Sequence, residues 1–290
     1  MNVLAVVVTH NPEPPALAAL LDALEEQADG VVVVDNGSGA DVGAFVAARG
    51  RPREEVVLLG GNLGVAAAQN RGIEIARRCG FGYVVLFDQD SLPAPGMVGI
   101  LHRAAEGRRR HGETVAAVGP RVVEAGAGRR LRPAPAGDVA PDGLAVADHV
   151  IASGCLMPLA ALERAGLMRA ELFIDWVDVE WCLRARAAAD LRCYVAGEAL
   201  LTHAFGEPVA ILGRTIVSRP PVRHYYYFRN ATWLLGQRWV PRPWRLRSAG
   251  RVLRRLAVCL VLTRPRRAQW RMAWHGIADG IAGRLGKGPA

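Results

Sequence analysis

The chain has 290 residues, enough for one large α/β domain and an appendage, and its content of 51% hydrophobic and 22% charged residues fits a globular protein. Its formal net charge of +9 is uneven: residues 238–290 hold 13 Lys and Arg against one acid, whereas residues 1–237 hold 23 basic and 26 acidic residues. The five cysteines form no Cys-x-x-Cys pair, which argues against a zinc site or a disulfide framework, and no apolar run in the tail approaches the roughly 20 residues of a membrane-spanning helix.

Apolar runs in the N-terminal third of the chain predict four buried strands, at residues 3–9, 31–34, 56–59 and 83–87. Two helices are predicted between them, at residues 15–27 and 65–78. Strands that alternate with helices of this length argue for a parallel, doubly wound sheet with right-handed crossovers. The loops that follow the strands of such a sheet gather at one edge, where ligands bind.

Each predicted strand runs into a polar or glycine-rich loop. The four loops are Thr9-His10-Asn11-Pro12, Asp35-Asn36-Gly37-Ser38, Gly60-Gly61-Asn62-Leu63-Gly64 and Asp88-Gln89-Asp90-Ser91. Asp35 could accept a hydrogen bond from a nucleotide base or ribose, although a turn-forming Asp explains it equally well. The glycines let backbone N–H groups approach an anion at a helix N-terminus. They match neither the dinucleotide pattern Gly-x-Gly-x-x-Gly nor a P-loop.

The pair Asp88 and Asp90 predicts a divalent metal site. Mg²⁺ takes one or two protein carboxylates and completes its shell with substrate phosphates and water, so the pair is suited to hold a metal against a diphosphate. A solvated turn at the strand end is the alternative.

These motifs, with Asn70-Arg71-Gly72 in the following helix, resemble the nucleotide-binding half of family 2 glycosyltransferases, most closely the bacterial rhamnosyltransferases that use dTDP-L-rhamnose. The resemblance covers about residues 1–235. It implies the GT-A fold, a nucleotide-sugar donor, Mg²⁺ or Mn²⁺, and inversion at the anomeric carbon. It also implies that Asp35 reads the base, that Asp88 lies near the ribose and that Asp90 binds the metal. The further nucleotide-binding residues that it implies are Thr9, His10, Asn11, Asn62, Gly64 and Asn70.

The acceptor half follows. We expect a helix at residues 94–110, a mobile loop at residues 126–142, which are rich in Gly, Pro, Ala and Arg, and a strand at residues 149–157. Ser153-Gly154 interrupts that strand, and a glycine there allows a ligand to approach closely, which places Gly154 at the cleft.

The candidate catalytic base is Asp178. The comparable segment of family 2 enzymes reads Glu-Asp-Val-Asp-Leu-Cys, in which the first Asp is the base, and here Val177 replaces the Glu and Glu180 the second Asp. The pattern Ile-Asp-x-Val-Asp-x-Glu-Trp, which ends at Trp181, is frequent in the rhamnosyltransferase branch. A carboxylate can take the proton of the acceptor hydroxyl. Asp175 and Glu180 are rivals for this role, and with Trp181 are placed in the cleft, while a helix N-cap is the alternative for Asp178.

Two later motifs complete the predicted site. His203 follows a short strand at residues 193–196 and could complete the metal shell, as a late His does in GT-A enzymes, although a single His after an apolar pair is often structural. The helix that opens at His224 resembles a Tyr-Tyr-x-x-Arg-Asn segment of the family, which places Tyr226 and Arg229 in the donor or acceptor cleft. Aromatic packing is the alternative for most of the tyrosines.

The chain therefore divides into a GT-A domain at residues 1–235 and a basic amphipathic helical tail at residues 236–290. Residues 252–262 place apolar side chains on one helical face, and basic helices with Trp at their borders lie in the membrane interface. Nucleic acid is disfavoured as the partner because the main domain is mildly acidic and carries no RNA- or DNA-binding motif. A solvated basic face that packs on the main domain is the other alternative.

The sequence thus predicts an inverting, metal-dependent glycosyltransferase that moves rhamnose, or a related deoxyhexose, from a dTDP-sugar to a glycan or lipid-linked acceptor in cell-envelope polysaccharide synthesis. We expect no signal peptide and a place in the cytoplasm, on the inner face of the cell membrane. The choice of thymidine over uridine rests on the resemblance alone. The alternatives are a UDP-sugar transferase, a nucleotidyltransferase, which is disfavoured because no lysine precedes Lys287 and no arginine precedes Arg49, and a non-catalytic sugar-nucleotide-binding module.

Overall fold

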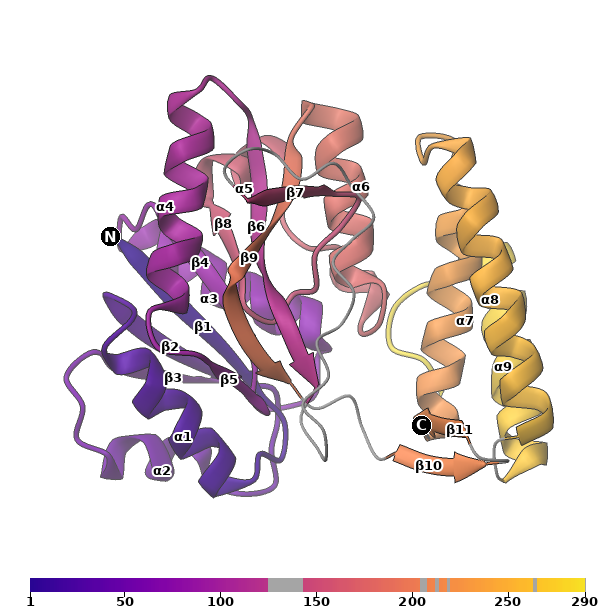
Figure 1. Ribbon diagram of the computed structural model, residues 1–290. Helices are drawn as coiled ribbons and strands as arrows, with labels where there is room; N and C mark the ends of the chain where they lie inside the picture. Colours follow the sequence, from indigo (N-terminus) through magenta and orange to yellow (C-terminus); the bar gives the residue numbers. More distant parts are fainter. Residues whose placement is uncertain (125–142, 204–207, 212–213, 218–219, 263–264, 290) are drawn as a thin grey trace.

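The computed structural model describes residues 1–289 except 125–142, 204–207, 212–213, 218–219 and 263–264 (Figure 1). The loop expected at residues 126–142 lies outside the described residues. A central sheet has helices on both faces, and a group of three C-terminal helices stands beside it.

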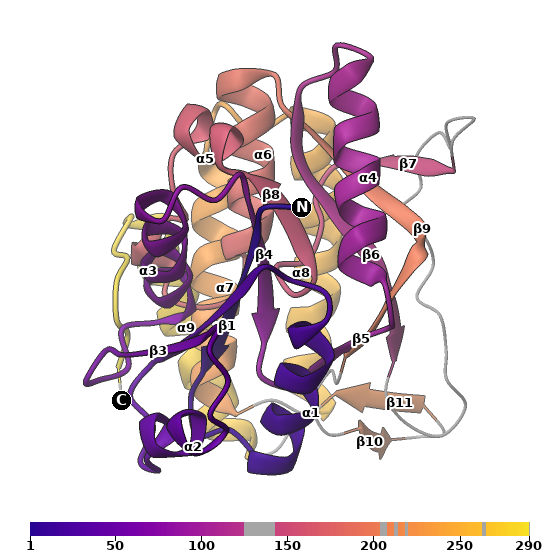
Figure 2. The ribbon, with the colours of Figure 1, turned by 90° about the vertical axis from the view of Figure 1, so that its left-hand side faces the viewer.

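The N-terminal half of the sheet is parallel, as predicted. Its strands lie in the order β3-β2-β1-β4, and their bounds are β1 (Val3–Thr9), β2 (Gly30–Asp35), β3 (Glu54–Leu58) and β4 (Tyr83–Asp88). Every residue of β1 is buried, because both faces of the sheet are covered. Figure 2 shows the helices on the two sides of these strands.

Alternation along β1 divides its side chains between two cores. Val3, Ala5 and Val7 pack with side chains of α1 (Pro14–Glu25), α2 (Val42–Ala48) and α4 (Met97–Arg110). Leu4, Val6 and Val8 pack on the other face with side chains of α3 (Val65–Arg78), α5 (Leu159–Ala165) and α6 (Val177–Ala189). Gly72 of α3 lies so close to Val6 that an added Cβ would be 2.2 Å from its Cγ1, and this approach brings α3 onto the sheet.

The second half of the sheet is mixed. β4 pairs antiparallel with β8 (Cys155–Pro158), and the order continues through β6 (Val115–Glu124), β9 (Arg192–His203) and β5 (Ser91–Pro93), while β7 (Leu144–Ala147) pairs with β9. The strand predicted at residues 149–157 begins only at Cys155. Gly154, with φ +77°, ends the preceding turn, and a Cβ there would lie 2.7 Å from Pro120. The glycine at position 154 therefore allows close packing of Pro120, and not the close approach of a ligand that the sequence predicts.

The remaining short elements are the 3₁₀ helix η1 (Ala170–Leu172), which precedes α6, and the hairpin of β10 (Pro208–Ile211) and β11 (Arg214–Val217).

The C-terminal helices are α7 (Pro221–Gly236), α8 (Arg242–Leu262) and α9 (Arg266–Ile281). They stand together on the α6 side of the molecule (Figure 1). Gly276 and Gly280 bring α9 against α7, since a Cβ at either position would lie within 2.4 Å of a backbone oxygen of α7. α7 therefore packs with the tail although it begins before residue 236. No helix in the described part of the chain is long and apolar enough to cross a bilayer.

Of the apolar side chains predicted on one face of residues 252–262, some are buried in the helical group and others are exposed. Val252 and Cys259 are buried among α7 and α9, and Leu256 packs against them. Leu253, on the same predicted face, is 65% exposed. Packing among the three C-terminal helices thus buries part of the apolar face that the sequence predicts to contact a membrane.

Candidate active site

A cavity of about 570 Å³ opens at the carboxyl ends of β1 and β4 and extends to the loop before α6. This is the edge of the sheet that the sequence indicates. The predicted site residues that line it are Thr9, His10, Asn62, Gly64, Asp88, Asp90, Asp175, Asp178 and His203. The chain therefore brings residues from β1, β4, β9 and α6 to a single cavity.

Asp88, Asp90 and His203 form one cluster in this cavity, in which one ligand atom from each lies within 4.8 Å of the others. His203 Nε2 lies 4.0 Å from Asp88 Oδ2, and His203 Nδ1 lies 3.6 Å from Asp90 Oδ1. Pairing of β5 with β9 sets Ser91 opposite His203 and so brings the imidazole to the end of β4. The turn after β4 aims both carboxylates at one point, as the metal hypothesis requires.

Two serines support the cluster. Ser153 Oγ accepts a hydrogen bond from the Asp88 N–H at 3.1 Å and lies 2.6 Å from Ser91 Oγ, which lies 2.8 Å from His203 Nδ1. A hydrogen bond to one ring nitrogen of a histidine fixes the ring, which is the usual support of a metal-binding histidine. In this arrangement Nε2 is the ring nitrogen that is directed toward Asp88.

This donor set fits a divalent cation. Carboxylate oxygens suit Mg²⁺ and Mn²⁺, and one imidazole is compatible with Mn²⁺. The surroundings raise the pKa of the Asp88 carboxyl, mainly because the neighbouring protein reduces its hydration and also because the carboxylates of Asp90 and Asp178 lie near, while His203 opposes the shift. Carboxylates that repel one another in this way are stabilised by a cation between them.

Asp178 lines the same cavity from the first turn of α6. The N-cap of this helix is Trp176, so the alternative that Asp178 caps the helix is wrong. Its carboxylate accepts hydrogen bonds from the Val179 N–H at 2.8 Å and the Ala152 N–H at 3.3 Å. Enclosure by protein nevertheless raises the pKa of Asp178, against the lowering effect of these bonds and of His149.

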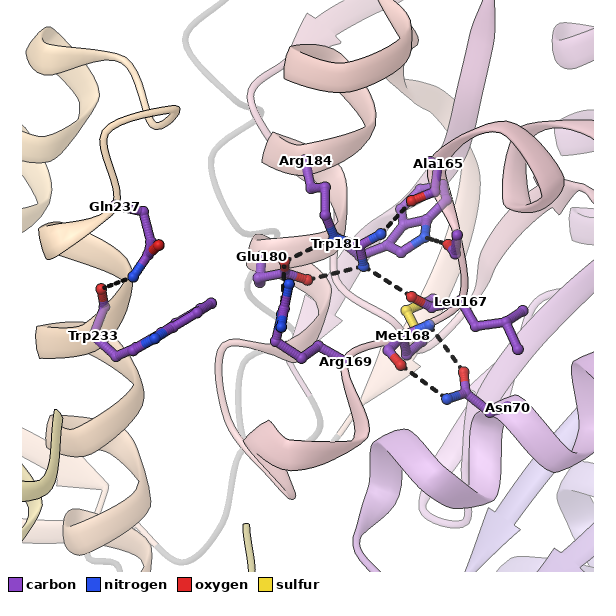
Figure 3. Close-up of polar contacts among 11 residues, drawn as sticks. Asn70, Ala165, Leu167, Met168, Arg169, Glu180, Trp181, Arg184, Trp233 and Gln237 are labelled. Atoms are coloured by element: carbon purple, nitrogen blue, oxygen red, sulfur yellow. Dashed lines mark hydrogen bonds and ion pairs between the residues drawn. The ribbon is translucent and has the colours of Figure 1, made fainter. Parts of the chain in front are cut away.

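The two rivals of Asp178 are engaged elsewhere. Asp175 lines the cavity but forms a two-point ion pair with Arg223, with contacts of 2.9 and 3.1 Å. Glu180 is fully buried, lies outside the cavity lining, and contacts Arg184 at 2.8 Å and Arg169 at 3.4 Å (Figure 3). Both carboxylates are thus occupied by ion pairs with arginine, so the geometry favours Asp178.

Three of the predicted nucleotide-binding residues hold the backbone around the cavity. The Asp35 carboxylate is buried and accepts hydrogen bonds from Thr9 Oγ1 at 2.9 Å, the Ser38 N–H at 2.9 Å and the Ser38 hydroxyl, so it fixes its own turn and does not line the cavity. Asn11 is also outside the lining, and its amide oxygen accepts a hydrogen bond from the Gly39 N–H. Asn70 exchanges two hydrogen bonds with the backbone of Met168 and thereby joins α3 to the segment before η1 (Figure 3).

Besides Glu180, four residues predicted in the cleft lie outside its lining: Gly154, Trp181, Tyr226 and Arg229. Trp181 is buried and donates from Nε1 to the Gly166 carbonyl (Figure 3). Tyr226 stacks on Phe173 with 4.9 Å between ring centroids, and Arg229 lies 4.9 Å from the centre of the Tyr226 ring. These two therefore lie behind the cavity wall, which agrees with the aromatic-packing alternative.

Three residues that the sequence did not single out contribute to the site. Arg223 lines the cavity, Ser153 supports the Asp88, Asp90 and His203 cluster, and His149 lies close enough to Asp178 to influence its pKa. The basic residue at the start of α7 and the serine of Ser153-Gly154 were visible in the sequence. Only the fold shows what they contact.

Comparison with known proteins agrees with this geometry. The sequence model described as "Glycosyl transferase family 2" matches residues 4–138. The chain is 32% identical over 302 residues to the "dTDP-rhamnosyl transferase RfbF" of Shigella flexneri, covering 99% of this chain and 98% of that protein. Among solved structures, S. aureus TarS residues 1–349 superposes with a TM-score of 0.60 at 18% identity, over 98% of this chain and 82% of that one. GalNAc-T7 with UDP, GalNAc and Mn²⁺ superposes with a TM-score of 0.58 at 10% identity, over 87% and 55%. The structural likenesses confirm the predicted GT-A fold.

Proposed function

The chain belongs to glycosyltransferase family 2, and from that premise we propose that it transfers rhamnose, or a related deoxyhexose, from a dTDP-sugar with inversion at the anomeric carbon. The observation that carries the proposal is that the Asp88, Asp90 and His203 cluster and the Asp178 carboxylate line the same cavity. The name of the Shigella relative supports the choice of donor. The acceptor that we propose is a glycan or a lipid-linked saccharide of the cell envelope.

Asp88, Asp90 and His203 are the residues that would hold Mg²⁺ or Mn²⁺. A divalent cation in that position offsets the charge that develops on the departing diphosphate. Ser91 and Ser153 keep His203 and Asp88 in place, so the cluster is arranged before the donor arrives. Thr9, His10 and Asn62 form the cavity wall beside the cluster and are proposed to contact the nucleotide.

Asp178 is proposed to act as the base. Its carboxylate takes the proton of the acceptor hydroxyl while that oxygen forms a bond to the anomeric carbon, and the bond from this carbon to the phosphate oxygen breaks. The bonding electrons leave with dTDP, and attack from the face opposite the leaving group inverts the configuration. The raised pKa of Asp178 makes it a stronger proton acceptor than an ordinary Asp.

We also propose that the basic helical tail holds the enzyme peripherally on an anionic membrane surface on the cytoplasmic side. Leu253 and Val261 of α8 are 65% and 59% exposed, and Trp270 and Trp274 of α9 are 47% and 51% exposed. Trp270, Val261, Arg266 and Arg267 line one hollow near the α8–α9 connection, so apolar and basic side chains occur together there. This combination suits the membrane interface.

Vesicle sedimentation tests the membrane proposal. The full chain should bind vesicles that contain phosphatidylglycerol and not vesicles of phosphatidylcholine alone. Trp270→Ala with Trp274→Ala should weaken binding, while Arg103→Glu on α4, an exposed residue of the other half, should not. Equal binding to both kinds of vesicle, or no effect of the tryptophans, contradicts the proposal.

The donor is tested by release of nucleoside diphosphate from a panel of nucleotide sugars, with Mn²⁺ and with membrane lipid extract as acceptor source. We expect turnover of dTDP-L-rhamnose and little turnover of UDP-GlcNAc or UDP-galactose. Preferential turnover of a UDP-sugar would establish the alternative donor. Binding without turnover of any donor would favour a non-catalytic sugar-nucleotide-binding module.

A further inference from the structure

The segment that leads into α6 has an unfavourable backbone conformation. Phe173, Asp175 and Trp176 have φ values of 64°, 64° and 67°, in the left-handed region that residues with a Cβ atom seldom occupy. Residues 173–178 all line the catalytic cavity. Backbone of this kind persists only where its surroundings hold it, and it is frequent at active sites. Something must therefore fix this segment.

The carbonyl groups of the segment are held by two consecutive side chains of α7. Asn230 Nδ2 donates to the carbonyl oxygens of Leu172, Ile174 and Asp175 at 2.8, 2.9 and 2.8 Å. Arg229 Nη2 donates to the Leu172 carbonyl at 2.9 Å and to the Glu171 carbonyl at 3.2 Å. These contacts are made by side chains that are almost completely buried, so water does not compete for them.

Arg229 and Asn230 also hold each other. Arg229 Nε donates to Asn230 Oδ1 at 2.8 Å, which fixes the orientation of the amide so that its N–H groups face the segment. The guanidinium lies over the rings of Tyr225 and Tyr226, with 5.4 and 4.9 Å to the two centroids. The Tyr-Tyr-x-x-Arg-Asn pattern thus forms one unit, in which the tyrosines surround the cation that the Arg brings into the interior.

The C-terminal segment closes the arrangement. The Gly286 N–H donates to the Glu171 carbonyl at 2.7 Å, and the Gly286 carbonyl accepts a hydrogen bond from Arg229 Nη1. On the opposite side the segment meets Gly64, where a Cβ would lie 2.7 Å from the Phe173 carbonyl oxygen. The strained segment is therefore held between the nucleotide half of the sheet and the C-terminal helices.

We propose that Arg229 and Asn230 are positioning residues, which hold the carbonyl groups of residues 171–175, and with them the positive φ angles of the segment, so that Asp178 faces the proposed metal cluster in the cavity. They contact neither the cavity nor the proposed reacting groups, and they act through the backbone that carries Asp175 and Asp178. The inference rests on the proposed role of Asp178. It assigns to the C-terminal helices a part in catalysis that is separate from membrane binding.

Asn230→Asp is the most direct test, since it keeps the shape of the side chain and the acceptor for Arg229 but removes both N–H donors. We expect kcat to fall by about tenfold or more, because small displacements of a catalytic group have large effects, while the affinity for dTDP with Mn²⁺ changes by less than about threefold. Hydrogen exchange of the amides in residues 173–178 should become faster, with β1 and α3 unchanged. Gln237→Glu is the matched control, because its amide lies directly after the last residue of the same helix and donates to the Trp233 carbonyl (Figure 3).

Two outcomes overturn the proposal: unchanged exchange in residues 173–178, or faster exchange with an unchanged kcat. Should Asn230→Asp fail to fold, Gly286→Pro decides, because it removes the N–H that bonds to Glu171 and cannot adopt φ +101°. It should give the same pattern in weaker form, and wild-type exchange and kcat would contradict the proposal. An active Asp178→Asn variant would instead refute the assigned base and leave the exchange result standing.

Discussion

Replacement of Asp178 by Asn tests the proposed base with little change in structure. The amide oxygen can still accept the hydrogen bond from the Val179 N–H, while the bond from the Ala152 N–H at 3.3 Å is weakened. Loss of one such bond costs about 1 kcal/mol, and removal of a carboxylate whose pKa is raised by its surroundings acts in the opposite direction. We therefore expect Tm to change by no more than about 4 °C in a chain of this size.

The catalytic effect should be much larger. A positioned general base contributes about 100- to 10,000-fold to the rate, which corresponds to about 3–5 kcal/mol of transition-state stabilisation. Release of dTDP from dTDP-L-rhamnose in the presence of acceptor measures this loss, and binding of dTDP with Mn²⁺ shows that the donor site is intact. Asp175→Asn is the control, because that carboxylate is already paired with Arg223, and it should reduce kcat less. A kcat for Asp178→Asn within about threefold of the wild type would refute the assignment.

The remaining predictions concern stability, the metal and pH. Glu180→Gln should lower the free energy of unfolding in urea by about 3 kcal/mol, because it leaves two guanidinium groups without the buried carboxylate that they contact. The kcat per folded molecule should stay unchanged, and a large loss of kcat at full stability would instead make Glu180 the base. Ser153→Ala should weaken Mn²⁺ binding by about 10- to 100-fold in calorimetric titration, since it removes the contacts to Ser91 and to the Asp88 N–H, and unchanged affinity would show that this support is unnecessary. Because the pKa of Asp178 is raised above its ordinary 3.8, kcat/KM should fall as the pH drops through that raised value. Stability depends on pH in the opposite direction, because a carboxyl whose pKa is raised on folding disfavours the native state when it is ionised. Protonation of this group should therefore raise the Tm of the metal-free protein as the pH falls through the raised pKa. An Asp178→Asn variant with the same pH profile of Tm would contradict this.

Much of the fold was accessible from the sequence because its strands are buried on both faces. The continuous runs of Val in β1 and β2 and the run at the start of β4 can be satisfied only in a covered sheet. The acceptor half was harder to predict. β6 was not predicted at all. Most of the strand expected at residues 149–157 is a loop, which ends at Gly154 with its positive φ. Pairing between strands distant in the chain, such as β6 with β9, leaves no local pattern.

The candidate site was likewise predicted in part. Asp88, Asp90 and Asp178 were identified from motifs, and the fold places them at one cavity with His203. Tyr226 and Arg229 were expected in the cleft, yet they lie behind its wall, because a motif indicates that residues matter without showing whether they contact the ligand or the backbone that surrounds it. Asn230 carries no signal for its role, since its three carbonyl partners lie more than fifty residues away.

The Asp88, Asp90 and His203 cluster is proposed to bind the divalent cation that holds the diphosphate of a dTDP-sugar. This proposal is tested most directly by thermal unfolding of the full chain with dTDP-L-rhamnose, in Mn²⁺ or in EDTA. A ligand at about 100 times its Kd stabilises the folded protein by about 2.7 kcal/mol, which raises Tm by about 5–10 °C in a chain of this size. We expect this rise for the wild type in Mn²⁺, a much smaller one in EDTA, and none beyond the EDTA level for Asp90→Ala in Mn²⁺. A rise in EDTA as large as that in Mn²⁺, or a full rise in the variant, would contradict the metal-bridged donor site.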